Sequence, residues 1–427
     1  MTKLDLDANL HGTVEMPGDK SISHRAIIFS SIGESTAKVE NCLLSDDVLA
    51  TIDAFKCMGV NIQIIDKNVI IDGVGLYGLK EPSKPIDCGN SGTTCRLLTG
   101  LLSMQSFKSM LVGDASLSKR PMKRVTLPLK QMGARINTSI NGTLPIEILP
   151  AELNKTPINY KLEIPSAQIF TSLLLASLYC NDASNIHCDN NFRDHTQRFF
   201  DFLNIPLRYK NHTYTTQPIK SFTNRDLKVP GDFSSAAFFI VLGVLTSDKG
   251  IIIKNVNLNP TRDALIGMLK KMGADITINH SSDSSYCEPV ADILCKKSAL
   301  KGTEFNLPET TIAIDEIPIL AIACAFADGI SIINNIAELR VKESDRISAI
   351  SKNLNSINIQ TSEKHDSLTV FGGQIQSGPI KTYHDHRIAM SFLIASLAAK
   401  TKFEFDDVEI IKTSFPNFFE TLELIYE

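Results

Sequence analysis

The sequence predicts a two-domain α/β protein built from six repeated helix and strand units, three in each domain. Three observations support this prediction. A short motif that ends a helix recurs along the 427 residues, a polar cluster followed by a long apolar run recurs upstream of it, and the last repeat is too short to be complete. The length also suits two or three domains of ordinary size.

The recurring motif is typical of the end of an amphipathic helix, followed by a stop and a short β-branched strand. Its strong copies contain Gly59, Gly133 and Gly273. Glycine readily takes the left-handed conformation that ends many helices. Two weaker copies carry Asn204 and Asn355 at the same place, and we expect both asparagines to end a helix in the same way.

Each copy follows a cluster of small or polar residues and then a long apolar run, which predicts a helix start and a buried helix. The clusters at 16–21 and 229–234 are similar to each other, since both contain Pro-Gly-Asp and a serine. An alternative is a single α/β domain with loose self-similarity. The six expected repeats, from helix start to strand end, span 20–64, 90–138, 166–209, 232–278, 315–360 and 384–427.

The sixth repeat lacks room for a closing strand, because the helix expected within 415–422 lies close to Glu427. The stretch Leu4–Leu10 has no partner in the first repeat, so we expect it to supply the strand that the last domain lacks. The chain would then cross between domains near Met16 and near Lys228. The expected domains are 16–228, and 1–15 together with 229–427.

Composition narrows the class of protein. The net charge of −4 gives no overall basic field for nucleic acid. The nine cysteines are scattered without a C-x-x-C pair, which predicts reduced thiols in the cytoplasm and argues against a zinc site. The polar N-terminus does not resemble a signal peptide, and no apolar run reaches the roughly 20 residues that span a membrane.

Basic residues gather at the expected helix starts of this slightly acidic chain. A helix N-terminus presents unpaired N–H groups and the positive end of the helix dipole, so it binds anions well. Each start by itself can equally be a capped helix or a solvated charged face. Together they predict a polyanionic small ligand. The basic residues are Lys20, Arg25, Arg96, Arg120, Arg193, Arg346 and Arg387.

The segment 341–346 has the densest alternation of cations and carboxylates. On a helix, Lys342 and Arg346 would share one face and repel each other. Glu343 lies beside them and is a candidate acid or base. The alternative is a surface helix with several salt bridges.

Eight motifs together resemble the signature series of the 5-enolpyruvylshikimate-3-phosphate synthase family, in the family's order and over nearly the whole chain. The Arg-x-His-Thr and Asn-x-Thr-Arg motifs resemble its class II branch. The resemblance implies a two-domain, inside-out α/β barrel, which agrees with the six repeats. The motifs are Gly18-Asp-Lys-Ser21 with His24-Arg25, Asn90-Ser-Gly-Thr93, Lys119-Arg-Pro-Met122, Ser166-Ala-Gln168, Arg193-Asp-His-Thr196, Asn259-Pro-Thr-Arg262, Val341-Lys-Glu-Ser-Asp-Arg346 and Asp385-His-Arg387.

Two positions depart from the family pattern. Phe170 stands where class II members usually carry a lysine after Ser-Ala-Gln. Near the C-terminus, Thr413 occupies the place of the lysine that class I members carry before Thr-Phe-Pro, and Lys412 lies one residue earlier. Gly92 matches a position at which resistant members carry alanine, so the resemblance leaves room for the inhibitor glyphosate.

The resemblance implies transfer of the enolpyruvyl group of phosphoenolpyruvate to the 5-hydroxyl of shikimate 3-phosphate, in chorismate and aromatic amino acid biosynthesis. Asp315 would take the hydroxyl proton, Glu343 would handle the methylene proton, and Lys20 would share this work. No metal or cofactor is expected, and the chain would be a cytoplasmic monomer that binds neither nucleic acid nor membrane.

The resemblance also implies which residues bind each substrate, and these come from both domains. Phosphoenolpyruvate would be bound by Lys20, Gly92, Arg120, Gln168, Arg346, Arg387 and Lys412. Shikimate 3-phosphate would be bound by Lys20, Ser21, Arg25, Ser166, Gln168, Arg193, Asp315 and Lys342.

Two other functions remain as alternatives. One is the sister enzyme that transfers enolpyruvyl to UDP-N-acetylglucosamine, but its catalytic cysteine sits on a mobile loop, whereas Cys95 falls within an expected helix. The other is a non-catalytic anion-binding relative, which would have no need of both Asp315 and Glu343.

Overall fold

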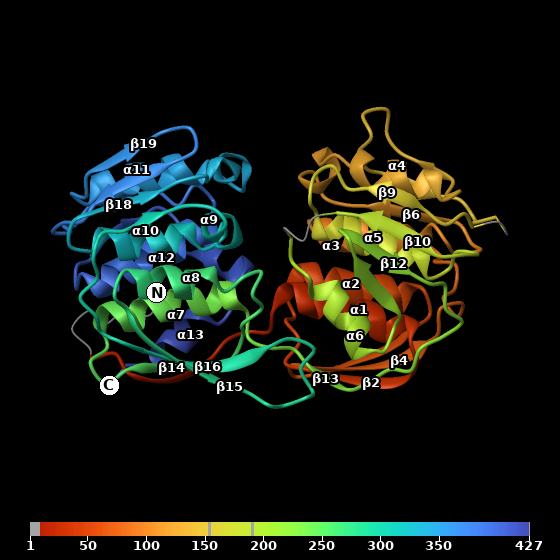
Figure 1. The fold of residues 1–427 in the computed structure, drawn as a ribbon, viewed down its shortest axis with the longest axis horizontal. Helices are drawn as coiled ribbons and strands as arrows, with labels where there is room; N and C mark the ends of the chain where they lie inside the picture. The colour runs from red at the N-terminus through yellow and green to blue at the C-terminus, as the bar shows by residue number, and fades with distance from the viewer. Residues whose placement is uncertain (1–8, 153–154, 189–191, 427) are drawn as a thin grey trace. The chain divides into compact units, whose positions relative to one another are not determined.

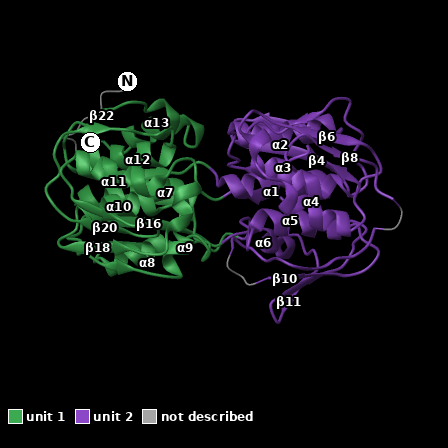
Figure 2. Cartoon of the chain, turned by 90° about the horizontal axis from the view of Figure 1, so that it is seen from above, with its two compact units in different colours: residues 1–17, 230–283, 289–427 green, residues 18–229, 284–288 purple. Residues whose placement is uncertain are grey.

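The chain forms two compact units, coloured separately in Figure 2. The computed structural model describes residues 9–152, 155–188 and 192–426. Unit 1 contains the described residues up to Pro17, with 230–283 and 289–426. Unit 2 contains 18–229 and the short segment 284–288. The sequence predicted two crossings between units, whereas in the structure the segment 284–288 also belongs to unit 2.

Among the described residues, five four-stranded sheets repeat one topology. We number the four strands of a sheet by their place in the repeat, for example β13, β2, β3 and β4. The first strand is parallel to the second. The fourth strand lies between the second and the third and is antiparallel to both. An apolar helix precedes the second strand and another helix precedes the third. The repeat is therefore strand, helix, strand, helix, strand, strand. The predicted repeats lack the short opening strand and end near the third strand, so they also leave out the fourth.

Unit 2 contains three complete repeats. The first comprises α1 (Lys20–Ile32), β2 (Glu34–Glu40), α2 (Asp46–Cys57), β3 (Asn61–Ile65), β4 (Asn68–Val74) and the returning strand β13 (Leu227–Lys228). The second comprises β5 (Ile86–Asp87), α3 (Gly92–Leu102), β6 (Ser109–Val112), the 3₁₀ helix η1 (Leu117–Lys119), α4 (Lys123–Gln131), β7 (Ile136–Asn137) and β8 (Ile146–Ile148). The third comprises β9 (Asn159–Lys161), α5 (Ala167–Ser177), β10 (Ser184–His187), α6 (His195–Phe202), β11 (Leu207–Lys210) and β12 (Thr213–Thr216).

Unit 1 contains two complete repeats and one shortened repeat. The first comprises β1 (Gly12–Glu15), α7 (Phe233–Thr246), β14 (Ile251–Asn257), α8 (Ala264–Lys271), β15 (Asp275–His280) and β16 (Val290–Lys296). The second comprises β17 (Glu304–Phe305), α9 (Glu309–Ile312), α10 (Ile317–Ala325), β18 (Ile330–Ile333), η2 (Ala337–Val341), α11 (Arg346–Ser356), β19 (Thr361–Glu363) and β20 (Leu368–Phe371). The third comprises β21 (Pro379–Ile380), α12 (His386–Ala398), β22 (Glu404–Phe405), η3 (Glu409–Thr413) and α13 (Phe418–Glu423).

Within each unit the apolar helices lie inside and the sheets lie towards the outside, as Figure 1 shows for α7, α10 and α12 of unit 1. Every residue of α10 is buried, and so are 233–244 of α7. A helix that is apolar on all faces needs such a position. No helix within the described part of the chain is long and apolar enough to cross a membrane.

Four of the five predicted helix stops are confirmed. Gly59, Gly133, Gly273 and Asn204 have φ values of 89°, 90°, 100° and 55°. The prediction for Asn355 is wrong, because α11 continues to Ser356. Asn358 takes the positive φ instead, at 69°. Asparagine tolerates this conformation at either place, so the sequence did not distinguish between them.

The first described residues pair with two distant parts of unit 1. The strand predicted at Leu4–Leu10 lies mostly outside the described residues, but Leu10 forms an antiparallel bridge with Tyr426. The strand β1 pairs in parallel with β14. Within the described residues, the sheet of the last repeat has only β21 and β22. The last repeat is therefore shortened, as the sequence predicted.

Candidate active site

The start of α1 carries three of the predicted site residues in unit 2. Asp19 caps this helix, since its Oδ1 accepts a hydrogen bond of 3.1 Å from the backbone N–H of Ile22. Lys20 begins the helix and forms an ion pair with Asp47. Its side chain remains 43% exposed, so its ammonium group is accessible to an anion from solvent.

Arg25, one turn further along α1, is held by neutral oxygen atoms. Its Nε donates to Thr196 Oγ1 at 2.8 Å and its NH2 to Thr171 Oγ1 at 3.1 Å. Its NH1 donates to the carbonyl of Ser21 at 2.9 Å. Burial lowers the pKa of Arg25 to about 10, with a smaller opposing effect of Asp19, so the guanidinium stays charged at neutral pH. The neighbouring His24 is buried, and this burial lowers its pKa to about 3.

A second group of site residues gathers at the start of α3. Arg96 NH1 donates to Gln168 Oε1 at 2.5 Å, and Gln168 Nε2 donates to Thr93 Oγ1 at 2.9 Å. A Cβ atom added to Gly92 would lie 3.2 Å from Arg120 NH1 and 3.4 Å from Arg96 NH1. Gly92 therefore lets two guanidinium groups approach the first turn of the helix, which is an anion-binding arrangement.

Arg96 belongs to this group, although the resemblance gave it no role. Burial lowers its pKa, and the nearby charges of Arg120 and Arg124 act in the same direction. A signal was present in the sequence, because Gly92 and Arg96 stand four residues apart and so share a helix face.

The motif 193–196 lies at the start of α6, next to the segment 284–288. His195 Nδ1 lies 2.8 Å from Glu288 Oε1, and both side chains are buried. Arg198 Nε lies 3.3 Å from Glu288 Oε2 and donates to Asp194 Oδ1 at 3.0 Å. Although Asp194, His195 and Glu288 have metal-ligand side chains that lie close together, Glu288 is already engaged by a guanidinium. We therefore interpret them as a salt-bridged support of the helix start.

In unit 1, the start of α12 anchors a buried arginine. Asp385 caps the helix by accepting from the backbone N–H of Arg387 at 2.9 Å. It also accepts from Arg346 Nε at 2.8 Å and from Ser344 Oγ at 3.1 Å. Burial would raise the pKa of Asp385, but the Arg346 charge and hydrogen bond outweigh it and hold this pKa below its usual value. The pair therefore stays ionised and fixes the guanidinium of Arg346.

Asp315 lies between two cations. Its Oδ1 is 3.6 Å from Lys342 Nζ and 3.6 Å from Arg346 NH1. Glu343 Oε2 binds Arg346 NH2 at 2.6 Å, and the Glu343 side chain is half exposed. The prediction that Lys342 and Arg346 share a helix face is wrong, because η2 ends at 341 and α11 begins only at Arg346. The Asp315 carboxylate offsets the repulsion between the two cations.

Arg346 NH1 lies in ion-pair range of Asp315 but lacks a hydrogen bond within the described residues. Its side chain is almost completely buried, yet NH1 makes no hydrogen bond within residues 9–152, 155–188 and 192–426. Buried donors without a partner are uncommon in native proteins. The arrangement therefore favours a ligand acceptor at this nitrogen.

The remaining predicted residues are more loosely placed. Ser166 precedes α5 but makes no side-chain cap bond. Arg193 is half-buried before α6. Lys412 pairs at the surface with Glu409, at 2.6 Å, and this contact joins it to none of the other predicted residues. Arg387 NH1 donates to the backbone carbonyl of Asp315 at 3.0 Å, so it does belong to the group in unit 1.

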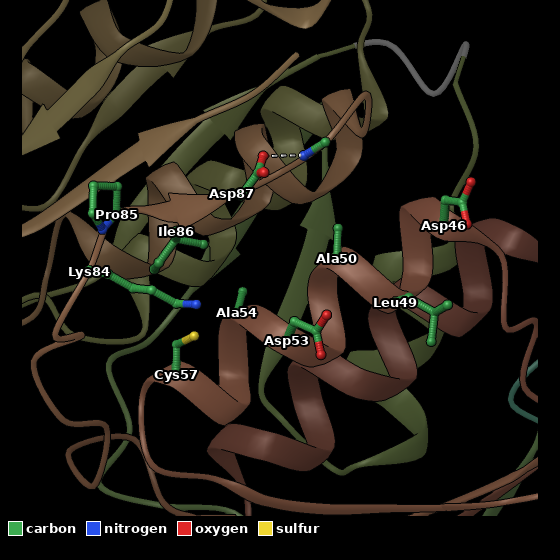
Figure 3. A pocket seen from close by; sticks show the side chains of 11 residues that line it. Asp46, Leu49, Ala50, Asp53, Ala54, Cys57, Lys84, Pro85, Ile86 and Asp87 are labelled. Atoms are coloured by element: carbon green, nitrogen blue, oxygen red, sulfur yellow. Dashed lines mark hydrogen bonds between the residues drawn. The ribbon is translucent and has the colours of Figure 1, made fainter.

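A pocket of about 450 Å³ lies apart from these residues, between α2 and β5 in unit 2 (Figure 3). Its lining includes three carboxylates, from Asp46, Asp53 and Asp87, and one ammonium group, from Lys84. The balance is acidic, and none of the predicted site residues lines it. This pocket does not suit a polyanionic ligand.

Comparison with known structures identifies the class to which this fold belongs. The enolpyruvyl transferase NikO from Streptomyces tendae has a similar fold, with a TM-score of 0.77, 16% identity and coverage of 98% of this chain and 95% of that one. The chain thus has the enolpyruvyl transferase fold, and the predicted fold class is confirmed.

Closer similarity defines the family. The family model for EPSP synthase (3-phosphoshikimate 1-carboxyvinyltransferase) matches residues 4–422. A 3-phosphoshikimate 1-carboxyvinyltransferase of Hydrogenovibrio crunogenus is 42% identical, over 98% of this chain and 95% of the relative. That of Legionella pneumophila (strain Lens) is also 42% identical, over 98% and 96%. The EPSP synthase structure from Acinetobacter baumannii matches with a TM-score of 0.92 and 38% identity, over 98% and 96%. The chain belongs to the EPSP synthase family.

Proposed function

We propose that this chain transfers the enolpyruvyl group of phosphoenolpyruvate to the 5-hydroxyl of shikimate 3-phosphate, with release of phosphate, in the shikimate pathway to chorismate and the aromatic amino acids. Membership of the EPSP synthase family supports the reaction. The observation that carries the assignment of residues is the position of Asp315 between Lys342 and Arg346, with Glu343 bound to the same guanidinium.

The reaction needs proton transfer beside strong anion binding. We infer that Asp315 accepts the proton of the substrate hydroxyl and that Glu343 protonates the methylene carbon of the enolpyruvyl group. Lys342 and Arg346 then stabilise negative charge on the substrates and on the tetrahedral intermediate. Lys20 shares in proton transfer as the accessible ammonium group of unit 2.

Guanidinium groups suit phosphate and carboxylate because they bind both in a bidentate manner and remain charged. We assign Arg96 to the phosphoenolpyruvate group as well, on the basis of its contact with Gln168. The other proposed phosphoenolpyruvate ligands are Lys20, Gly92, Arg120, Gln168, Arg346, Arg387 and Lys412. The proposed shikimate 3-phosphate ligands are Lys20, Ser21, Arg25, Ser166, Gln168, Arg193, Asp315 and Lys342.

Three further properties belong to this proposal. We propose a cytoplasmic monomer, and the nine free cysteines are compatible with a reducing compartment. We also propose that 16–228 and 1–15 with 229–427 are folding domains, which differ from the two compact units mainly in the segment 284–288.

The direct test is phosphate release from phosphoenolpyruvate with shikimate 3-phosphate as acceptor. Release that needs both substrates, and that falls by about 100-fold or more in Glu343→Gln, is the expected result. Release with UDP-N-acetylglucosamine in place of shikimate 3-phosphate would assign the sister activity. Release with neither acceptor would leave an anion-binding protein.

A further inference from the structure

A chain of buried polar groups lies behind Arg387 in unit 1. Arg262 NH2 donates to Ser234 Oγ at 2.7 Å, and Ser234 Oγ donates to Glu316 Oε1. Glu316 Oε1 lies 3.8 Å from Arg387 NH1. The contacts therefore connect the turn that carries Arg262 with a residue of the proposed site.

The Asn-Pro-Thr-Arg motif directs Arg262 into this chain. Asn259 Oδ1 accepts hydrogen bonds from Thr261, at 2.8 Å from the backbone nitrogen and 2.6 Å from Oγ1. The carbonyl of Asn259 accepts from the backbone N–H of Arg262 at 2.8 Å. This tight turn places the Arg262 side chain in the interior, where it is 3% exposed. The motif thus orients Arg262, whose hydrogen bonds lead to the proposed site.

The charges in the chain are balanced. Arg262 lies 3.5 Å from Asp232, which also caps α7 by accepting from the backbone N–H of Ser234 at 2.7 Å. Glu316 forms the corresponding ion pair with Arg387. Buried charges are tolerated when they are paired and hydrogen-bonded, so each of these groups limits where its neighbour can sit.

The geometry of Arg387 leaves one edge of its guanidinium for a ligand. Its hydrogen bond to the Asp315 carbonyl and its ion pair with Glu316 both use NH1. Within the described part of the chain, Nε and NH2 have no hydrogen-bond partner. That edge is the one that binds a carboxylate through two parallel hydrogen bonds. Contacts to NH1 therefore orient the edge that recognises the ligand.

We propose that Glu316 is a positioning residue for Arg387, held in place by Ser234 and Arg262, and that it tunes affinity for phosphoenolpyruvate without touching it. This inference rests on the proposed function, in which Arg387 binds phosphoenolpyruvate. It extends that function to three residues to which the family resemblance gave no role in the site.

The first test is Glu316→Gln, which removes the charge and keeps the size of the side chain. We expect the KM for phosphoenolpyruvate to rise about tenfold, because Arg387 loses its ion pair and the orientation of its free edge. The KM for shikimate 3-phosphate and kcat should change by less than about threefold. A lower KM for phosphoenolpyruvate would show that Glu316 acts only as an opposing negative charge and would overturn the proposal.

The second test is Ser234→Ala, alone and combined with Glu316→Gln. Ser234 is the link between Arg262 and Glu316, so its loss should also raise the KM for phosphoenolpyruvate, by about threefold. Groups that act as one unit give non-additive effects. The double variant should therefore be no worse than Glu316→Gln alone, and fully multiplied effects would contradict the chain of contacts.

Two controls separate positioning from unfolding and from simple charge removal. Glu309→Gln removes a carboxylate of unit 1 that pairs with Lys271 and has no contact with Arg387, so the KM for phosphoenolpyruvate should stay within about twofold. Calorimetric titration of each variant with shikimate 3-phosphate reports whether it is folded. An inactive wild type would refute the proposed function, whereas an active wild type with an unchanged Glu316→Gln KM would refute only the role of Glu316.

Discussion

The two units share a repeated topology but hold their arginines in different ways. In unit 2 three guanidinium groups of the proposed site are oriented by neutral oxygens: Arg25 by two threonines, Arg96 by Gln168, and Arg120 by Asn90 at 2.6 Å. In unit 1 they are held by carboxylates, with Arg346 bound to Asp385 and Glu343. The same helix starts thus present two kinds of charged surface.

The difference indicates a division of labour. A neutral acceptor orients a guanidinium without cancelling its charge, so the positive field remains available for phosphate and carboxylate groups. A carboxylate partner cancels charge, but it brings an acid or base close to the anion-binding group. Lys20 with Asp47, and Arg198 with Asp194 and Glu288, are exceptions in unit 2. We therefore expect loss of the unit 1 carboxylates proposed to transfer protons, Asp315 and Glu343, to lower kcat, whereas changes in the networks that only hold an arginine should mainly raise KM.

The largest effect is expected for Asp315→Asn. The amide cannot accept the hydroxyl proton, and it removes the charge between Lys342 and Arg346. We expect kcat to fall about 10²–10⁴-fold, the usual contribution of a general base. Phosphate release under saturating substrates measures kcat, and calorimetry measures shikimate 3-phosphate binding.

The result for Asp315→Asn tests the proposed division of labour between the two units. Binding that survives while kcat collapses would support catalysis from unit 1. A loss confined to KM would mean that Asp315 serves only to hold the two cations, and the division of labour would be wrong.

A smaller effect is expected for Glu288→Gln in unit 2. This change keeps the shape of the side chain but weakens its contacts with His195 and Arg198, which fix the start of α6 next to Arg193. We expect the KM for shikimate 3-phosphate to rise about fivefold to tenfold and the KM for phosphoenolpyruvate to change by less than about twofold.

The variants Glu288→Gln and Glu316→Gln form a matched pair that steady-state kinetics can compare. Both replace a buried glutamate by glutamine, one in each unit. Opposite substrate selectivity would support separate roles for the two networks. Equal increases in both KM values for both variants would point to a general loss of structure instead.

The local features of the fold could be predicted from the sequence, because they depend on neighbouring residues. Asp19, Ser91 and Asp232 cap helices at the predicted starts. Strands of two residues, such as β5 and β21, were missed because two residues carry no periodic signal. Their existence depends on pairing with strands elsewhere in the repeat.

The networks behind the predicted site residues could not be predicted. Glu288 lies 93 positions from His195, and Glu316 lies 82 positions from Ser234. Each contact requires the register of several elements to be known, which no local pattern supplies. The motifs supplied the residues that we propose to face the ligand, whereas the fold identified those that hold them.

A modest effect is expected for Gly92→Ala. The added Cβ would lie 3.2 Å from Arg120 NH1, so this guanidinium end must move by a few tenths of an ångström, whereas Arg96 NH1 at 3.4 Å would be in ordinary contact. A displaced side chain costs about 0.5–1.5 kcal/mol, which corresponds to a rise of about twofold to tenfold in the KM for phosphoenolpyruvate. Steady-state kinetics at saturating shikimate 3-phosphate measures this change.

Gly267→Ala is the matched control for this prediction. A Cβ atom at Gly267 meets nothing within 4 Å, and the residue lies in α8 of unit 1. Its KM values should be unchanged. A similar KM rise in both variants would show that the crowding at Gly92 is not the cause.

The smallest effect on activity is expected for Phe170→Leu, at the position where the family's class II members usually carry lysine. The Phe170 ring is fully buried, with its centre 4.8 Å from that of Tyr214 and 5.2 Å from that of Phe192. Loss of these aromatic contacts and of some volume should lower the free energy of unfolding by about 1–3 kcal/mol. Neither KM should change, because the fully buried ring packs against Tyr214 and Phe192.

Phe170→Lys provides the sharper contrast, since it would bury an ammonium group among aromatic rings. An unpaired buried charge is far more costly than the loss of aromatic contacts and some volume, so this variant should unfold at a markedly lower temperature than Phe170→Leu. Thermal unfolding of both variants makes the comparison. If Phe170→Lys were as stable as the wild type and lowered the KM for either substrate, the side chain at this position would reach the proposed site. The groups of unit 2 that bind substrate would then have to include it.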